Sequence, residues 1–242
     1  MTTMTHAPPL AIHVEGLGKR FGPQAALKSI DLRVRQGERL AIFGPNGSGK
    51  TTLLRILTGL TRQTKGTFTI AGSDYQHDGA ALRQRVGVVA HHPYLYEDLS
   101  AEENLVFYGR MFGLAEPGSR AQALLAQVGL AARRRDKART FSRGMQQRLA
   151  LARALLHDPD ILMMDEPDTG LDQEGSQIIE GLLQRQGPPR TVVMATHNLA
   201  LGRAHCERFL ILASGRIAYE GPFANIGLPQ LQDIYQRYAT AQ

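Results

Sequence analysis

The apolar positions along the chain follow two patterns that indicate strands. Apolar and polar residues alternate in LAIHVEG (10–16) and SIDLRVR (29–35), whereas ILMM (161–164) and TVVMA (191–195) are almost continuously apolar. Alternation is typical of a strand with one exposed face, and a continuous run of a strand covered on both faces. Further strand candidates are RLAIFG, GTFTIAG, RVGVVA, RFLILAS and RIAYEG. The mixture predicts a parallel α/β core with an antiparallel β flank.

Helical spacing of apolar residues predicts the intervening helices, over 51–60, 100–112, 120–128, 144–156, 173–186 and 231–238. The stretch from about 94 to 140 contains several of these helices and no convincing strand, so we interpret it as a helical insert. The sequence has no internal repeat, low-complexity tract or obvious linker. We therefore expect one domain over residues 1–242.

The composition and the N-terminal sequence indicate the cellular compartment of the protein. The hydrophobic content of 43% is enough for a sizeable core. The single cysteine, Cys206, excludes an internal disulfide and is expected to fill a gap in the core. The N-terminal MTTMTHAPPL lacks a basic region followed by an apolar one, and no run approaches the roughly 18 to 20 apolar residues that cross a bilayer. We expect a cytoplasmic protein.

The net charge does not distinguish between the possible classes of ligand. The net charge of +6 and the pI near 9.7 suit a polyphosphate, a nucleic acid or the anionic cytoplasmic face of a membrane equally well. The dense basic run RRRDKAR (133–139) is interpreted as a solvated helix end and loop.

The segment GPNGSGKT matches the phosphate-binding loop, between the strand RLAIF and the helix TTLLRILTGL. Its glycines allow backbone N–H groups to turn toward phosphates, the helix N-terminus favours an anion, and Lys50 adds a positive charge. Thr51 is expected to place its hydroxyl on Mg²⁺. The candidate ATP-binding residues here are Gly44, Pro45, Asn46, Gly47, Ser48, Gly49, Lys50, Thr51 and Thr52.

Two carboxylates follow the apolar strand in ILMMDEP (161–167). Open α/β sheets bind ligands at the carboxyl ends of their strands, and adjacent strand residues point in opposite directions. We expect Asp165 to hold Mg²⁺, directly or through water, and Glu166 to orient and deprotonate the attacking water.

The stretch from 140 to 172, TFSRGMQQRLALARALLHDPDILMMDEPDTGLD, resembles the nucleotide-binding subunits of ABC transporters. FSRGMQQR occupies the place of the family's LSGGQ signature, and TGLD that of its D-loop, which ends at Asp172. The resemblance implies a head-to-tail homodimer in which Ser142 and Gly144 contact the γ-phosphate of the ATP bound by the partner subunit. Arg143 and Met145 depart from the commonest signature, and we do not infer inactivity from them.

The resemblance assigns two further residues. His197 in MATHN matches the switch histidine that hydrogen-bonds the γ-phosphate, and Phe21 lies where the family has an aromatic that stacks on adenine. Packing in the core is the alternative for Phe21.

Two adjacent histidines follow the strand RVGVVA. His91 occupies the place of a family glutamine that reaches Mg²⁺ and the attacking water. Imidazole replaces an amide as a hydrogen-bonding group, although it is shorter and can titrate near neutral pH, so hydrolysis is expected to depend on pH. The alternative, a separate metal site, lacks a ligand pattern around His91 and His92.

Within the family, His91 together with ENLVFYGRMFG resembles the ATP-binding subunit of the haem exporter of cytochrome c maturation. The general resemblance covers nearly the whole chain, whereas this finer one rests on residues 86–113. It implies a groove that receives a helix of a membrane subunit, lined by Tyr94, Tyr96, Leu99, Phe107 and Tyr108. Burial in the core of the insert is the alternative for Leu105, Phe107 and Tyr108.

The sequence therefore predicts an ATPase that uses ATP and Mg²⁺, peripheral on the inner face of the membrane, bound to integral membrane subunits and expected not to bind nucleic acid. Haem export or handling is the first expectation for its task. The alternative in the same class is a drug, lipid or polysaccharide exporter, and the alternative of another class is an ABC ATPase acting on ribosomes or DNA.

Overall fold

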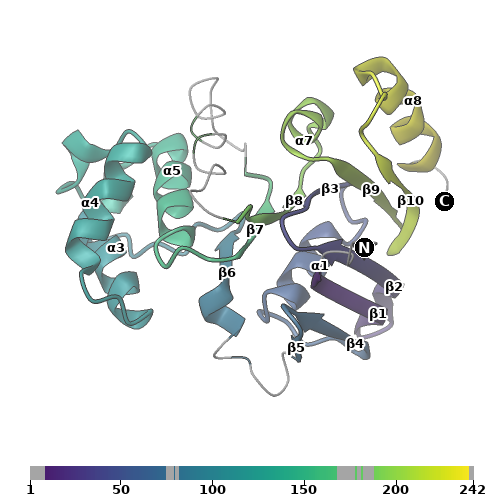
Figure 1. Ribbon diagram of the computed structural model, residues 1–242, viewed down its shortest axis with the longest axis horizontal. Helices are drawn as coiled ribbons and strands as arrows, with labels where there is room; N and C mark the ends of the chain where they lie inside the picture. The colour runs from purple at the N-terminus through teal and green to yellow at the C-terminus, as the bar shows by residue number, and fades with distance from the viewer. Residues whose placement is uncertain are drawn as a thin grey trace, which may run out of the picture.

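Two β-sheets form the centre of the fold, which is known from a computed structural model that describes residues 9–74, 79, 82–167, 178, 181 and 188–239 (Figure 1). The larger sheet has the strand order β10-β9-β3-β8-β7-β6. Its strands are β3 (Arg39–Phe43), β6 (Val86–Val89), β7 (Ile161–Asp165), β8 (Thr191–Ala195), β9 (Arg208–Ala213) and β10 (Arg216–Pro222). All neighbours pair in parallel except β10, which pairs antiparallel with β9.

The smaller sheet is antiparallel, with the order β2-β1-β4-β5. Its strands are β1 (Leu10–Phe21), β2 (Gln24–Arg35), β4 (Lys65–Ile70) and β5 (Ser73–Asp74). Over residues 29–35 of β2, buried and exposed residues alternate, whereas every residue of β7 and β8 is buried. The predicted parallel core with an antiparallel flank is confirmed.

The helices are α1 (Lys50–Leu57), α3 (Ala101–Met111), α4 (Pro117–Gln127), α5 (Arg143–Ala154), α7 (Leu199–His205) and α8 (Leu228–Ala239), with 3₁₀ turns at Ala131–Arg133 and Ala138–Thr140. A capping box of Ser100 and Glu103 starts α3. Helices α3 and α4 pack with α5 at one end of the molecule, and the antiparallel sheet lies at the other (Figure 1). The sequence pattern missed α7, because seven residues are too few to display a helical period. The helix predicted over 173–186 lies outside the described residues apart from 178 and 181.

Alternate residues of β3 enter two different hydrophobic cores. Ala41 and Phe43 pack in the core shared with α4, α5 and α7, and Leu40 and Ile42 in the core shared with α1 and the antiparallel sheet. Burial on both faces fixes the strand's register, because a slip of one residue would exchange its faces. The carboxyl end of β3, where the phosphate-binding loop starts, is thereby held in place.

Two smaller findings complete the fold. Cys206 is buried in the core that contains α7, as expected. Within the described ranges, no helix has the length and apolar character needed to span a membrane.

Candidate functional site

The segment 44–49 forms a tight loop between β3 and α1. Gly49, which caps α1, has a φ of 110°, and a Cβ there would lie 2.8 Å from the carbonyl oxygen of Ala26. Gly44 is more crowded, since its Cβ would lie 2.2 Å from the carbonyl oxygen of Leu212. Only glycine fits such positions, so the loop keeps its backbone close to the neighbouring strands. The N-terminus of α1 therefore opens on the concave side of the loop.

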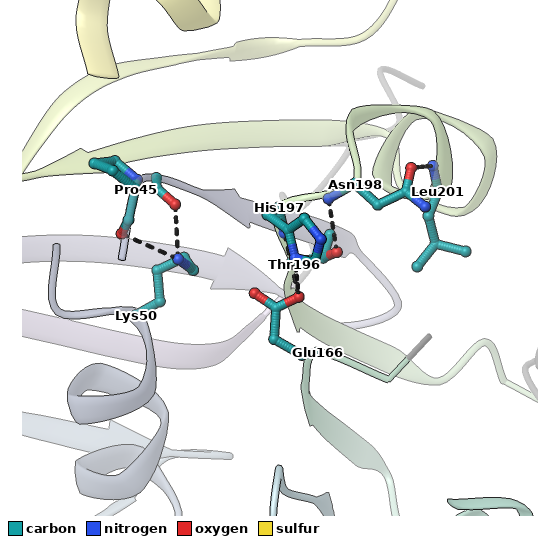
Figure 2. A network of polar contacts seen from close by, with 8 residues as sticks. Pro45, Lys50, Glu166, Thr196, His197, Asn198 and Leu201 are labelled. Carbon is teal, nitrogen blue, oxygen red and sulfur yellow. Dashed lines mark hydrogen bonds and ion pairs between the residues drawn. The ribbon is translucent and has the colours of Figure 1, made fainter. Parts of the chain in front are cut away.

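Lys50 is the first residue of α1 and points back into the loop. Its Nζ donates hydrogen bonds to the carbonyl oxygens of Gly44 at 2.7 Å and Pro45 at 3.3 Å (Figure 2). Burial lowers the pKa of Lys50, and the nearby carboxylates of Glu166 and Asp165 oppose that shift. A buried ammonium held by carbonyl oxygens alone gains much from a phosphate anion.

Asp165 ends β7 beside Thr51. Burial raises the pKa of Asp165, and a hydrogen bond from the Thr51 side chain opposes the shift. The Oδ1 of Asp165 and the Oγ of Ser48 are buried and have no hydrogen-bond partner among the described residues. Buried oxygens of this kind normally bind a donor, a water molecule or a cation. Thr51 and Asp165, two of the three residues predicted to hold the metal, therefore lie together, and Asp165 offers an unfilled ligand oxygen.

Glu166 lies just beyond the strand and faces His197, which follows β8 (Figure 2). Its Oε2 lies 2.5 Å from Nδ1 of His197. Glu166 also has a φ of 51°, a strained value for a residue with a side chain, and its N–H donates to the carbonyl oxygen of Ala195. With this backbone the Glu166 carboxylate faces His197 and lines a cavity together with the loop that follows β3.

A cavity of about 970 Å³ unites most of the predicted site. Its lining includes residues 44–52 together with Phe21, His91, Asp165, Glu166 and His197. Phe21 is 54% exposed on the rim of this cavity, so the alternative of core packing is wrong. His91 faces the cavity, while His92 is absent from its lining and lies with its ring tilted against that of Tyr94, the ring centres 5.5 Å apart.

The signature residues lie apart from this cavity. Ser142 caps α5 and accepts a hydrogen bond from the N–H of Met145, and neither Ser142 nor Gly144 lines the cavity. Such separation is what a site completed by a second subunit requires. Asp172 lies outside the described residues.

Sequence reasoning missed several lining residues. Gln24 to Ala26 and Lys28 come from the start of β2, Ser214 and Gly215 from the turn between β9 and β10, and Tyr235 from α8. The turn between β9 and β10 packs closely against the start of β2, since a Cβ on Gly215 would lie 2.6 Å from the carbonyl oxygen of Ala26. The Ser-Gly pair at 214–215 is the only local sequence signal among these residues, because it indicates a turn. Nothing near Tyr235 in the sequence indicates that it lies at the cavity.

A phosphate-binding loop after a buried parallel strand, with two carboxylates at the end of another, defines a P-loop nucleotide-binding protein. A family model described as ABC transporter matches residues 27–169. The chain therefore belongs to the ABC transporter family, as an ATP-binding subunit, and it is an ATPase.

Two relatives and one solved structure illustrate the match. The chain is 37% identical over 214 residues to the daunorubicin resistance ATP-binding protein DrrA3 of Streptomyces coeruleorubidus, covering 87% of this chain and 68% of DrrA3. It is 35% identical over 209 residues to the linearmycin resistance ATP-binding protein LnrL of Bacillus subtilis, covering 85% and 67%. The dimeric post-hydrolysis state of the ATP-binding cassette MJ0796, bound to ADP and Pi, matches with a TM-score of 0.79 and 29% identity, covering 88% and 98%.

These relatives correct the finer expectation. The names of DrrA3 and LnrL refer to resistance to daunorubicin and to linearmycin, and none of the three proteins has a name that refers to haem or to cytochrome c. The comparisons thus favour the exporter alternative over haem export. The finer resemblance misled because it rested on residues 86–113 alone, and so short a segment carries little information about cargo.

Proposed function

We propose that this chain is the ATP-hydrolysing subunit of an exporter and that all of it forms a single ATP-binding domain. One observation carries the proposal: Lys50, Thr51, Asp165, Glu166 and His197 converge on one cavity although they come from three separate parts of the chain. Such convergence of a phosphate cradle and paired carboxylates supports hydrolysis rather than binding alone.

Each residue has its own role in the proposed reaction. The N–H groups of residues 46–52 and the ammonium of Lys50 bind the phosphates of ATP. The Glu166 carboxylate accepts a proton from the attacking water, and His197, already 2.5 Å from it, orients that carboxylate and the γ-phosphate. Phe21 stacks on the adenine at the rim of the cavity.

The residues fit Mg²⁺. A hydroxyl from Thr51, the unpartnered carboxylate oxygen of Asp165 and the imidazole of His91 offer hard or borderline ligands beside the phosphate cradle. Bound there, Mg²⁺ would neutralise charge on the β- and γ-phosphates.

The chain is proposed to act as a homodimer. Ser142, Gly144 and Asp172 would complete the site of the partner subunit, with the N-terminus of α5 directed at the γ-phosphate. Closing the dimer on ATP and reopening it after hydrolysis would drive the membrane subunits on the cytoplasmic side.

A surface for those subunits lies on the insert. Tyr94, Tyr96, Phe107 and Met111 are large hydrophobic residues with exposed fractions of 36%, 47%, 39% and 67%. Of the residues for which the sequence left a choice, Leu105 is fully buried, Tyr108 is half-buried and Phe107 is exposed. A cluster of exposed aromatic side chains favours a protein partner.

The test is ATP turnover by the purified chain with Mg²⁺, together with the proteins recovered when it is captured from solubilised membranes. We expect phosphate release that depends on Glu166 and a polytopic membrane protein in the captured complex. Recovery of RNA or ribosomal proteins instead would support the non-transport alternative, and haem in the captured complex would restore the haem expectation. No phosphate release by either the free or the captured chain would contradict the proposal.

A further inference from the structure

Tyr235 lines the nucleotide cavity from an element that no motif of the sequence brings there. It lies in α8, beyond the residues 27–169 that the family model matches. The cavity lining nevertheless places it together with Glu166 and His197, two residues of the proposed hydrolytic site. The C-terminal helix therefore contributes a phenol to the cavity in which ATP is proposed to bind.

The amphipathic pattern of α8 explains why Tyr235 has a fixed place. Leu231, Ile234, Tyr235 and Tyr238 follow the spacing i, i+3, i+4, i+7 and all pack against one hydrophobic core, in which Leu231 is fully buried. Through this face α8 contacts β9 and α7 (Figure 1). Helix α7 begins two residues after His197. The core thus fixes Tyr235 relative to the segment that carries His197.

Both ends of α8 are anchored by specific contacts. Just before the helix, the carbonyl oxygen of Ile226 accepts a hydrogen bond from Nε of Arg203, in α7, at 2.8 Å. In its last turn, the ring centre of Tyr238 lies 4.9 Å from that of Tyr219, in β10. A helix held at both ends keeps the side chains between them in place, so Tyr235 is part of the rigid wall of the cavity.

The hydroxyl of Tyr235 is available as a hydrogen-bond donor. The side chain is partly buried against the core, and among the residues that the structure describes the hydroxyl has no hydrogen-bond partner. Burial raises the pKa of Tyr235, and the negative charge of Glu166 adds to the shift. The phenol therefore stays protonated at neutral pH, within electrostatic range of that carboxylate.

Glu166 has a matching acceptor. The contacts from His197, one from its Nδ1 and one from its backbone N–H, both end on Oε2 of Glu166, and no other described residue donates to Oε1. The Glu166 side chain is only 18% exposed, so bulk water reaches it poorly. A hydroxyl that donates to an ionised carboxylate forms one of the stronger hydrogen bonds in proteins. The same cavity thus holds an unused donor and an unused acceptor.

We propose that Tyr235 is a positioning residue for ATP hydrolysis: its hydroxyl donates a hydrogen bond to the Glu166 carboxylate, directly or through one water molecule. Together with His197 it holds the carboxylate in the orientation that accepts the proton of the attacking water. The inference rests on the proposed function, since it requires Glu166 as the base. A base that is already oriented needs no reorganisation during the reaction, so the bond raises kcat and leaves the affinity for ATP unchanged.

The experiment compares Tyr235→Phe with Tyr238→Phe in the intact chain. Tyr235→Phe removes the hydroxyl and keeps the ring that packs against the core. Tyr238→Phe is the matched control, because Tyr238 lies in the same helix, is also partly buried and does not line the cavity. Turnover at saturating ATP and Mg²⁺, equilibrium ATP binding and the thermal unfolding midpoint are measured for both. Each substitution is then repeated in the Glu166→Gln background.

We expect kcat to fall by about ten-fold in Tyr235→Phe, the value of one hydrogen bond to a charged group, while ATP affinity stays within about two-fold. Tyr238→Phe should hydrolyse ATP as the wild type does. In the Glu166→Gln background, adding Tyr235→Phe should change the residual kcat by less than about two-fold, because the hydroxyl acts through the carboxylate. A role of Tyr235 in folding alone would not produce this dependence on Glu166.

Three results overturn the inference: equal kcat in Tyr235→Phe and Tyr238→Phe, the same fold-loss of kcat with and without Glu166, or a loss of ATP affinity with kcat unchanged. None of them contradicts the proposed function, because each leaves Glu166 as the base. The proposed function fails instead if Glu166→Gln turns over ATP as fast as the wild type.

Discussion

At the scale of the residue, Glu166 combines a left-handed backbone with a side chain aimed at His197. Glu166→Gln keeps the shape and removes the base, so we predict a fall in kcat of about 10² to 10⁴-fold. ATP affinity should stay within about two-fold, because the carboxylate acts on water rather than on the nucleotide. Phosphate release and equilibrium nucleotide binding measure the two effects. Glu97→Gln, an exposed carboxylate outside the cavity, is the control, and equal turnover in both variants would remove Glu166 as the base.

Substitution of Lys50 tests the phosphate-binding part of the site. In Lys50→Ala the phosphate cradle loses its buried ammonium, and the carbonyl oxygens of Gly44 and Pro45 lose their donor. We predict that ATP affinity falls by roughly 10 to 100-fold, the value of one charge-assisted hydrogen bond. Isothermal titration with ATP measures the loss. Lys28→Ala, on the far rim of the same cavity, should bind nearly as well as wild type; if the two variants weaken equally, the cradle is elsewhere.

At the scale of the element, the loop between β3 and α1 offers a matched pair of glycines. Gly47 and Gly49 both have positive φ values, 79° and 110°, but a Cβ meets nothing within 4 Å at Gly47 and meets Ala26 and Leu27 at 2.8 Å at Gly49. Gly47→Ala should cost about 1 kcal/mol of unfolding free energy, and Gly49→Ala about 2 to 4 kcal/mol. Urea unfolding of both variants measures the difference, and equal costs would show that the backbone relaxes away from β2.

The contact between α5 and the end of α3 predicts a pH dependence of stability. His157, just after α5, stacks on Phe112, just after α3, and its pKa falls from 6.5 to about 4 through burial. Between those values the unfolded chain binds a proton that the folded chain does not, so stability falls as the pH drops from 6.5 to 4. We predict a loss of about 2 kcal/mol over that range, absent in His157→Leu. Urea midpoints at several pH values measure it, with the exposed His92→Leu as the control; equal slopes in wild type and His157→Leu would contradict the assignment.

Strands and helices with a clear hydrophobic period were predictable from the sequence. Residues that reach the site only through contacts between distant parts of the chain were not. The nine predicted strand segments all form strands, because burial on one or both faces dictates their patterns. The phosphate loop and the paired carboxylates were equally visible, since their geometry is local. By contrast, Tyr235 and the turn at Gly215 reach the cavity through the packing of β9, β10 and α8, which no local pattern describes. The roles proposed for the site residues stay predictions.

At the scale of the whole molecule, the signature and the phosphate loop belong to different surfaces. Ser142 and Gly144 lie at the start of α5, and neither lines the cavity that contains the N-terminus of α1. Figure 1 shows α5 and α1 in different parts of the molecule. We therefore predict that a single chain binds ATP without using its own signature, and that a second chain is needed to employ it. Binding and dimerisation should be separable by mutation.

We predict that Glu166→Gln, which retains ATP, sediments as a dimer with ATP and as a monomer without it. Adding Gly144→Asp should abolish the dimer while monomeric ATP affinity is kept, because a carboxylate at the start of α5 repels the partner's γ-phosphate. Adding Lys50→Ala instead should weaken both. Analytical ultracentrifugation and nucleotide binding on the same samples measure the two properties. If Gly144→Asp weakened ATP binding to the monomer, the signature would act on its own subunit's nucleotide, and the head-to-tail arrangement would be wrong.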